Sequence, residues 1–175
     1  MNTKIWMRKS LAIIGSALMS LMIANVAYAA VQNIIAEVEF ANPVSITVPV
    51  ALKFGILDVG LLGSESITIA PNSTVTGDIA RITGGTQAAS SMTVTATTAT
   101  PLSIQVSNIT NNTGYTLGTF VCKYNGGTDT ACQAAPYLLT SVASAPLLIG
   151  ATLLGTGSAA VGTFNGSFDV TVAYQ

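Results

Sequence analysis

The chain has 175 residues, of which 50% are hydrophobic and only 7% are charged, and it contains no histidine. Without histidine it lacks the commonest general base and the commonest metal ligand, and its seven acidic residues are scattered. An enzyme is therefore not expected, and no cofactor is predicted. The few basic residues do not form the cluster that phosphate binding requires, which excludes nucleic acid as a partner.

The first 29 residues have the pattern of a secretory signal peptide. Lys4, Arg8 and Lys9 precede an apolar run over residues 11–24, and Ala27-Tyr28-Ala29 forms a small-x-small cleavage site. The apolar run is short for a bilayer span. We therefore predict an exported protein that is not integral to the membrane and that resides in the periplasm, at the cell surface or outside the cell.

Beyond the signal peptide, apolar and polar residues alternate in short runs that are separated by turn-forming residues. This period of two is typical of β-strands, and no run repeats at the helical spacing. The pattern predicts a single domain over residues 30–175 that folds as an all-β, antiparallel Ig-like β-sandwich. The apolar positions of the clearest runs are Ile34, Ala36, Val38 and Phe40; Val44, Ile46 and Val48; Ile67 and Ile69; Met92, Val94 and Ala96; and Leu102, Ile104 and Val106.

Cys122 and Cys132 are the two cysteines of the chain. In an exported protein an even number of cysteines indicates a disulfide. The turn-forming sequence Asn125-Gly126-Gly127 lies between them and favours a hairpin that brings them together. Two thiolates without histidine do not supply the four ligands of a zinc site, so we predict the Cys122–Cys132 disulfide.

The last fourteen residues, Gly162 to Gln175, alternate without interruption and predict a half-buried terminal β-strand. Such a strand either closes a complete sandwich or offers its edge to a strand of a partner. The apolar face of the alternation contains Phe164, Phe168, Val170, Val172 and Tyr174.

Three segments resemble the bacterial secreted family called domain of unknown function 4402 (DUF4402). They are Leu52-Lys53-Phe54-Gly55-Ile56-Leu57, the central Ser91-Met92-Thr93-Val94-Thr95, and the tail from Gly162 to Tyr174. The tail is similar to a closing pattern G-x-F-x-G-x-F-x-V-x-V-x-Y. The family name implies no activity.

The tail is also similar to the C-terminus of chaperone–usher pilus subunits, with Gly162 at the fourteenth position from the end and Tyr174 next to last. This resemblance implies a periplasmic chaperone as a partner and a homopolymer formed by donor-strand exchange. The donor would be the run from Ile34 to Phe40, which can alternatively be the first strand of its own domain. The candidate strand-donation or interface residues are Ile34, Ala36, Val38, Phe40, Phe164, Phe168, Val170, Val172 and Tyr174.

We therefore expect a secreted structural or adhesive surface protein, with a pilin-like subunit that assembles by strand donation as the finer hypothesis. The alternative is a self-complete extracellular β-sandwich that binds glycan or protein. In that alternative, Tyr115, Tyr124 and the loop between Cys122 and Cys132 would form the contact surface.

Overall fold

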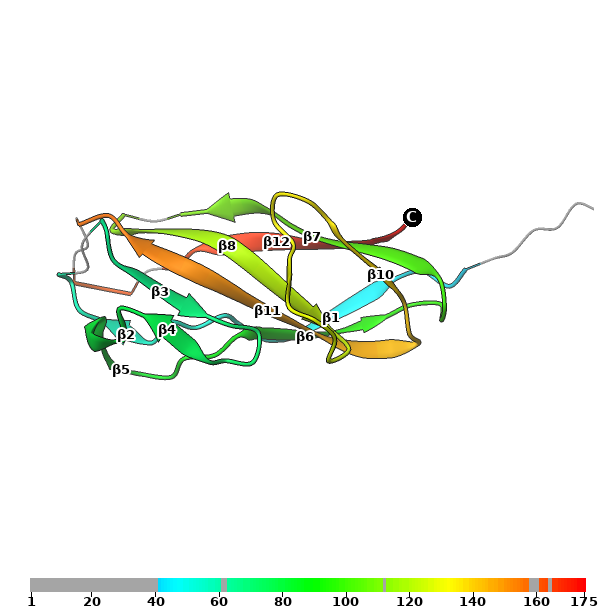
Figure 1. Cartoon of the computed structure of the whole chain (residues 1–175), viewed down its shortest axis with the longest axis horizontal. Helices are drawn as coiled ribbons and strands as arrows, with labels where there is room; N and C mark the ends of the chain where they lie inside the picture. The colour runs from blue at the N-terminus through cyan, green and yellow to red at the C-terminus, as the bar shows by residue number, and fades with distance from the viewer. Residues whose placement is uncertain (1–40, 61–62, 112, 158–160, 164) are drawn as a thin grey trace, which may run out of the picture. The chain divides into compact units, whose positions relative to one another are not determined.

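A computed structural model describes residues 41–60, 63–111, 113–157, 161–163 and 165–175, which belong to the second of the two units of the chain, Met1–Glu39 and Phe40–Gln175. Strands dominate this part of the chain, and a short 3₁₀ turn, η1, interrupts them (Figure 1). The elements are β1 (Ser45–Val50), β2 (Ile56–Leu57), β3 (Ser66–Ile69), β4 (Val75–Gly77), η1 (Ile79–Arg81), β5 (Ile82–Gly84), β6 (Ser90–Thr95), β7 (Pro101–Thr110), β8 (Tyr115–Tyr124), β9 (Thr130–Ala131), β10 (Tyr137–Thr140), β11 (Ser144–Gly155) and β12 (Ser167–Tyr174).

The larger sheet is organised around the long strand β11. Strand β11 pairs with β6 through its first half, with β3 through its second half, and with β8 along most of its length. Strand β1 extends this sheet beyond β6, β4 extends it beyond β3, and β9 pairs with β8. All of these pairings are antiparallel, as the alternating sequence predicted.

The smaller sheet contains β10, β7 and β12 in that order, and it packs on the larger sheet. The apolar residues of β7 alternate with polar ones, so Leu102, Ile104 and Val106 are buried between the sheets. Across the interface, the rings of Phe120 on β8 and Phe168 on β12 lie 4.8 Å apart at 55°. This tilted contact joins the two layers of the sandwich.

The prediction of an all-β antiparallel sandwich is confirmed. The prediction for the tail is correct in its faces but wrong in its length. The strand β12 begins at Ser167, whereas Gly162 and Thr163 have no strand pairing. A Cβ on Gly166 would lie 2.9 Å from the Thr110 carbonyl oxygen and 3.0 Å from Leu117 Cδ1, so the chain there presses against its neighbours instead of continuing the regular pleat.

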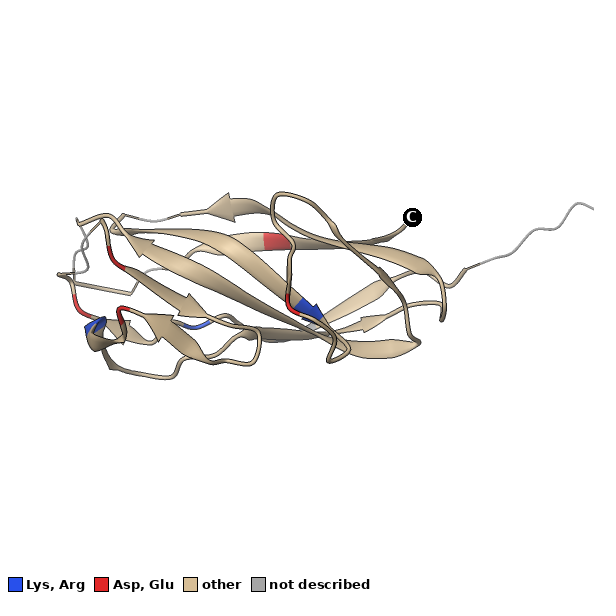
Figure 2. Cartoon of the chain, in the orientation of Figure 1, with Lys and Arg blue, Asp and Glu red and all other residues tan. Residues whose placement is uncertain are grey.

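Charged residues are few and leave most of the strand surfaces without charge (Figure 2). In the described part of the chain, no helix has the length and apolar character needed to cross a membrane. The same residues contain no group of three or more side chains suited to hold a metal ion. The predicted signal peptide, residues 1–29, lies outside the described residues.

Candidate functional site

A groove of about 990 Å³ opens along one side of the sandwich, between the two sheets. One wall comes from β1 and the segment 51–59 that follows it. The other comes from residues 161–163, 165 and 166 and from the first half of β12. The floor includes Met92 on β6 and Leu117 on β8, both of which pack in the hydrophobic core. The groove therefore gives access from the surface to the interior of the sandwich.

Each of the two strands beside the groove has one unpaired edge in the described part of the chain. Strand β12 pairs with β7 and β1 pairs with β6, and no second partner of either strand occurs among these residues. Edge strands carry unsatisfied backbone N–H and C=O groups, which another strand can pair with. The side of the sandwich between β1 and β12 therefore combines free backbone groups with an apolar floor.

Several large apolar side chains that line the groove are exposed. Ile56 is 62% exposed, Val59 is 47% exposed and Val161 is 90% exposed, and all three line the groove. Val50, at the end of β1, is a further lining residue that is 39% exposed. Exposed apolar side chains that gather in one groove are typical of an interaction site.

Tyr115 also lines the groove, at the beginning of β8. Its partial burial raises the pKa of the phenol above its ordinary value, and a hydrogen bond with the backbone of Gly166 opposes this shift. The phenol is therefore neutral at physiological pH. This hydrogen bond joins β8, in the larger sheet, to the residues that lead into β12, in the smaller sheet. It therefore links the two sheets at this end of β8.

The end of β12 is held by Tyr174. Its hydroxyl donates a hydrogen bond to the carbonyl oxygen of Asn42 (2.6 Å) and accepts one from the backbone N–H of Thr97 (2.7 Å). The backbone N–H of Asn42 in turn donates to Thr97 Oγ1 (2.7 Å). The end of β12 thus lies at the residues that precede β1, which means that these two strands run in opposite directions.

The basic residues differ in their surroundings. Arg81 donates hydrogen bonds to Glu65 (Nη2 to Oε1, 2.8 Å) and pairs with Asp58, and the hydrogen bond with Glu65 raises the pKa of Arg81. Lys123 Nζ lies 3.2 Å from Asp129 Oδ1. Lys53 is exposed, lines the groove and has no ion-pair partner among the described residues.

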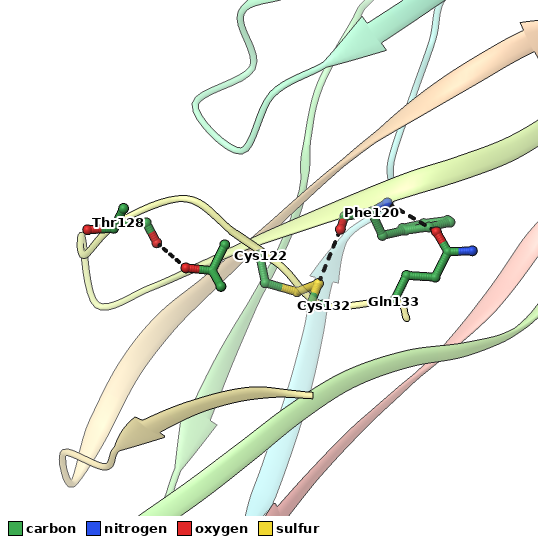
Figure 3. The surroundings of a disulfide bond; sticks show 6 residues. Phe120, Cys122, Thr128, Cys132 and Gln133 are labelled. Carbon is green, nitrogen blue, oxygen red and sulfur yellow. Dashed lines mark hydrogen bonds between the residues drawn. A yellow bond between two sulfur atoms is a disulfide. The ribbon is translucent and has the colours of Figure 1, made fainter. Parts of the chain in front are cut away.

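The predicted disulfide is confirmed. It joins Cys122 on β8 to Cys132, which follows β9, and both cysteines are fully buried (Figure 3). Between them the chain turns at Asn125 and Gly126, both of which have a positive φ, as the Asn-Gly sequence predicted. On the other side of the bridge, Gln133 Oε1 accepts a hydrogen bond from the Phe120 N–H (Figure 3).

We expect removal of this disulfide to lower the stability of the sandwich without changing its strands. The bridge closes a loop with a sequence separation of 10 residues, for which the loss of chain entropy in the unfolded state corresponds to roughly 2–3 kcal/mol. The double substitution Cys122→Ala and Cys132→Ala should lower the free energy of unfolding by about that amount, as measured by denaturant titration. Identical unfolding of the wild-type protein with and without reductant would contradict the expectation.

The structure separates the candidate interface residues of the tail into two groups. All four described residues pack against the core, but only Phe168 and Val170 also line the groove. Tyr174 in addition forms the hydrogen bonds described above. The remaining candidates, Ile34, Ala36, Val38, Phe40 and Phe164, lie outside the described residues.

The tyrosines of the alternative binding surface do not lie together. Tyr115 and Tyr124 occupy the two ends of β8, and Tyr124 is only 5% exposed. The hydroxyl of Tyr124 accepts a hydrogen bond from the Val142 N–H (3.2 Å). The Tyr124 side chain is therefore part of the core and not of an exposed contact surface.

Sequence reasoning did not identify the other wall of the groove. Leu52 and Phe54 belong to this wall and Leu117 to the floor, and none of the three was predicted as an interface residue. The available sequence feature is the alternation Leu52-Lys53-Phe54, which continues that of β1 and places two apolar side chains on one face. Alternation shows which side chains of a strand share a face, but it does not show which other segment of the chain that face packs against.

Comparisons with known proteins agree with one of the two resemblances. Neither the curated proteins nor the solved structures contain a match to this chain. The similarity of the tail to chaperone–usher subunits therefore stays a prediction. Residues 44–174 match the model of the family described as Domain of unknown function (DUF4402), and these residues include every strand described above. The chain belongs to the DUF4402 family.

Proposed function

We propose that this protein is an exported structural or adhesive subunit of the bacterial surface, which assembles by accepting a strand from a partner into the groove between β1 and β12. The observation that carries this proposal is the coincidence of the apolar groove with the free edge of β12. An incoming strand can pair with the backbone of that edge while its alternate side chains fill the apolar floor.

Three further observations support the proposal. The disulfide is consistent with export, because such bonds persist in oxidising compartments. The scarcity of charge allows close packing of subunits. The similarity of the tail to pilus subunits is consistent with a pilin-like role, in which a periplasmic chaperone would protect the groove before assembly.

The test is to export the full chain to a periplasm that lacks any partner genes and to purify it by size-exclusion chromatography. We expect oligomers that form a ladder on a gel without heating and that collapse to one band when the same sample is boiled. Such a ladder indicates non-covalent strand exchange, because heat disrupts it. A monomer that unfolds in one sharp thermal transition would contradict the proposal and favour a self-complete binding module.

A further inference from the structure

We infer that residues 56–60 and 79–84 form a hinged strap in one wall of the groove, and that the ion pair between Arg81 and Glu65 holds this strap closed. The first segment contains β2, and the second contains η1 and β5. The two segments pair with each other as a two-stranded sheet of their own (Figure 1). Opening of the strap regulates access to the groove, and in this respect the inference rests on the proposed function.

The strap is weakly attached to the rest of the fold. No residue of 56–60 or 79–84 is buried, whereas β6, β7, β8 and β11 each contribute buried side chains to the core. Strand β2 has only two residues and β5 only three. A segment with few buried side chains and an exposed backbone opens at a lower free energy than the core of the same protein. The strap can therefore open while the two main sheets stay folded.

Two glycines form the hinge of the strap. Gly55 and Gly85 precede β2 and follow β5, and their φ angles of +86° and +77° lie in the left-handed region that glycine adopts easily. A Cβ on Gly85 would lie 3.1 Å from Gly55 Cα, so the two glycines are neighbours. On the side away from the strap, Lys53 and Ala88 exchange two backbone hydrogen bonds of 2.9 Å. The chain is thus fixed on that side, and the glycines can absorb a change in direction.

The strap covers a small apolar cluster that is separate from the main core. Ile67 and Leu153 form this cluster, and Leu57 and Ile82 of the strap pack against it. Ile67 is 0% exposed and Leu153 is 4% exposed. Leu153 also lines the groove, so the groove reaches the same cluster. When the strap opens, these two side chains are added to the apolar floor that a partner strand can contact.

The ion pair of Arg81 and Glu65 connects the strap to the larger sheet. Arg81, in η1, donates from Nε (3.0 Å) and from Nη2 (2.8 Å) to Oε1 of Glu65, which directly precedes β3. The two side chains are only 28% and 20% exposed, and hydrogen bonds between charged groups are stronger than those between neutral ones. Asp58, within the strap, lies 3.4 Å from Arg81 Nη1. Arg81 therefore binds both segments of the strap to the residue that leads into β3.

The first test removes this ion pair and measures hydrogen–deuterium exchange in the full chain by mass spectrometry. In Arg81→Gln, the exchange of residues 56–60 and 79–84 should rise roughly five- to tenfold, while that of β8 and β11 stays unchanged. Arg81→Lys keeps the charge and should restore part of the protection. The matched control is Lys123→Gln, which removes the ion pair with Asp129 at the same exposed fraction of the cation, 28%, and should leave the exchange of the strap unchanged.

The second test uses salt to separate the charge of Arg81 from the packing of its side chain. Salt weakens the attraction between partly exposed charges. High salt should therefore raise the exchange of the wild-type strap toward that of Arg81→Gln and should change the variant little. An equal effect of salt on both proteins would mean that Arg81 acts through packing alone, which overturns the ion pair as the fastening.

Exchange decides whether the strap exists. If residues 56–60 and 79–84 of the wild type exchange as slowly as β8 and β11, they open only with the whole fold, and the strap is overturned. If Arg81→Gln raises exchange equally in the strap and in these strands, the substitution destabilises the whole subunit, which also overturns the inference.

Assembly, measured on the same samples by size-exclusion chromatography, decides whether the strap regulates the groove. A partner that needs the open strap gains affinity in proportion to the open fraction, so Arg81→Gln should raise the association constant by about the same factor as the exchange. Faster exchange without stronger association would overturn the regulation. If the wild-type chain does not assemble, the proposed function fails, whereas the exchange experiment still decides whether the strap opens.

Discussion

Substitution of Val170 by aspartate is expected to abolish assembly while leaving much of the subunit folded. Val170 is half-buried, lines the groove and packs against the core. While the groove is open, water can reach a carboxylate at this position. A strand seated over it would remove that water and leave a buried charge without a partner, which is far more costly than the loss of apolar contact alone.

The expected loss of association is at least about 3 kcal/mol, or roughly a hundredfold in the dissociation constant. Sedimentation or size-exclusion mass measures assembly, and circular dichroism measures the folded fraction in the same samples. The matched control is Thr171→Asp, which adds the same charge on the exposed face of β12 and should assemble normally. Val170→Thr keeps the shape of the side chain and should give a smaller loss in a folded subunit.

Equal loss of assembly in Thr171→Asp would mean that negative charge in general, and not occupation of the groove, prevents association. Wild-type assembly by Val170→Asp would exclude the groove as the contact. Both results can be distinguished from simple unfolding because the dichroism spectrum and the melting temperature are recorded for each variant.

The faces of the strands could be predicted from the sequence because burial between two sheets imposes a period of two. The alternation of Leu102, Ile104 and Val106 predicted their burial, and the even-numbered residues Phe168, Val170 and Val172 of the tail point to the core as expected. The disulfide could be predicted because spacing, compartment and the Asn-Gly turn favoured the same pairing.

The bounds of β12 and the groove could not be predicted in the same way. Gly162 to Gly166 continue the alternation, yet the approach of Gly166 to the Thr110 carbonyl ends the regular strand. The groove depends on which strand lies next to which. The local sequence of β1 or β12 does not indicate that the two strands lie on either side of one groove. Only the wall formed by the tail was therefore predicted from the sequence.

The two halves of β12 have different roles. The half of β12 near Ser167 lines the groove, whereas the half near Tyr174 is fixed to Asn42 and Thr97. A strand that binds a partner must keep its position when the groove is empty. The hydrogen bonds of Tyr174 fix the strand in this way. The last residues of β12 therefore stabilise the fold of the subunit, whereas the first residues are available to contact a partner.

Substitution of Gly150 by alanine is expected to prevent stable folding. Gly150 lies in β11 beside the register shift in its pairing with β8, and it is buried. A Cβ there would overlap the Ile69 carbonyl oxygen and would lie 2.8 Å from the Ala70 carbonyl carbon and 2.9 Å from the Pro71 nitrogen. All of these are backbone atoms, so no side-chain rotation can relieve the overlap.

The strand β11 joins β6, β3 and β8, and a displacement at Gly150 therefore disturbs the centre of the larger sheet. We expect the free energy of unfolding to fall by about 3 kcal/mol or more, at the upper end of the cost of overpacking. Gly118→Ala is the matched control, because Gly118 lies beside the same register shift and a Cβ there would meet nothing within 4 Å. Denaturant titration of both variants should separate them clearly. Equal stability of the two would mean that β11 and the turn after β3 can move apart at little cost, so that close packing at this crossing does not hold the larger sheet together.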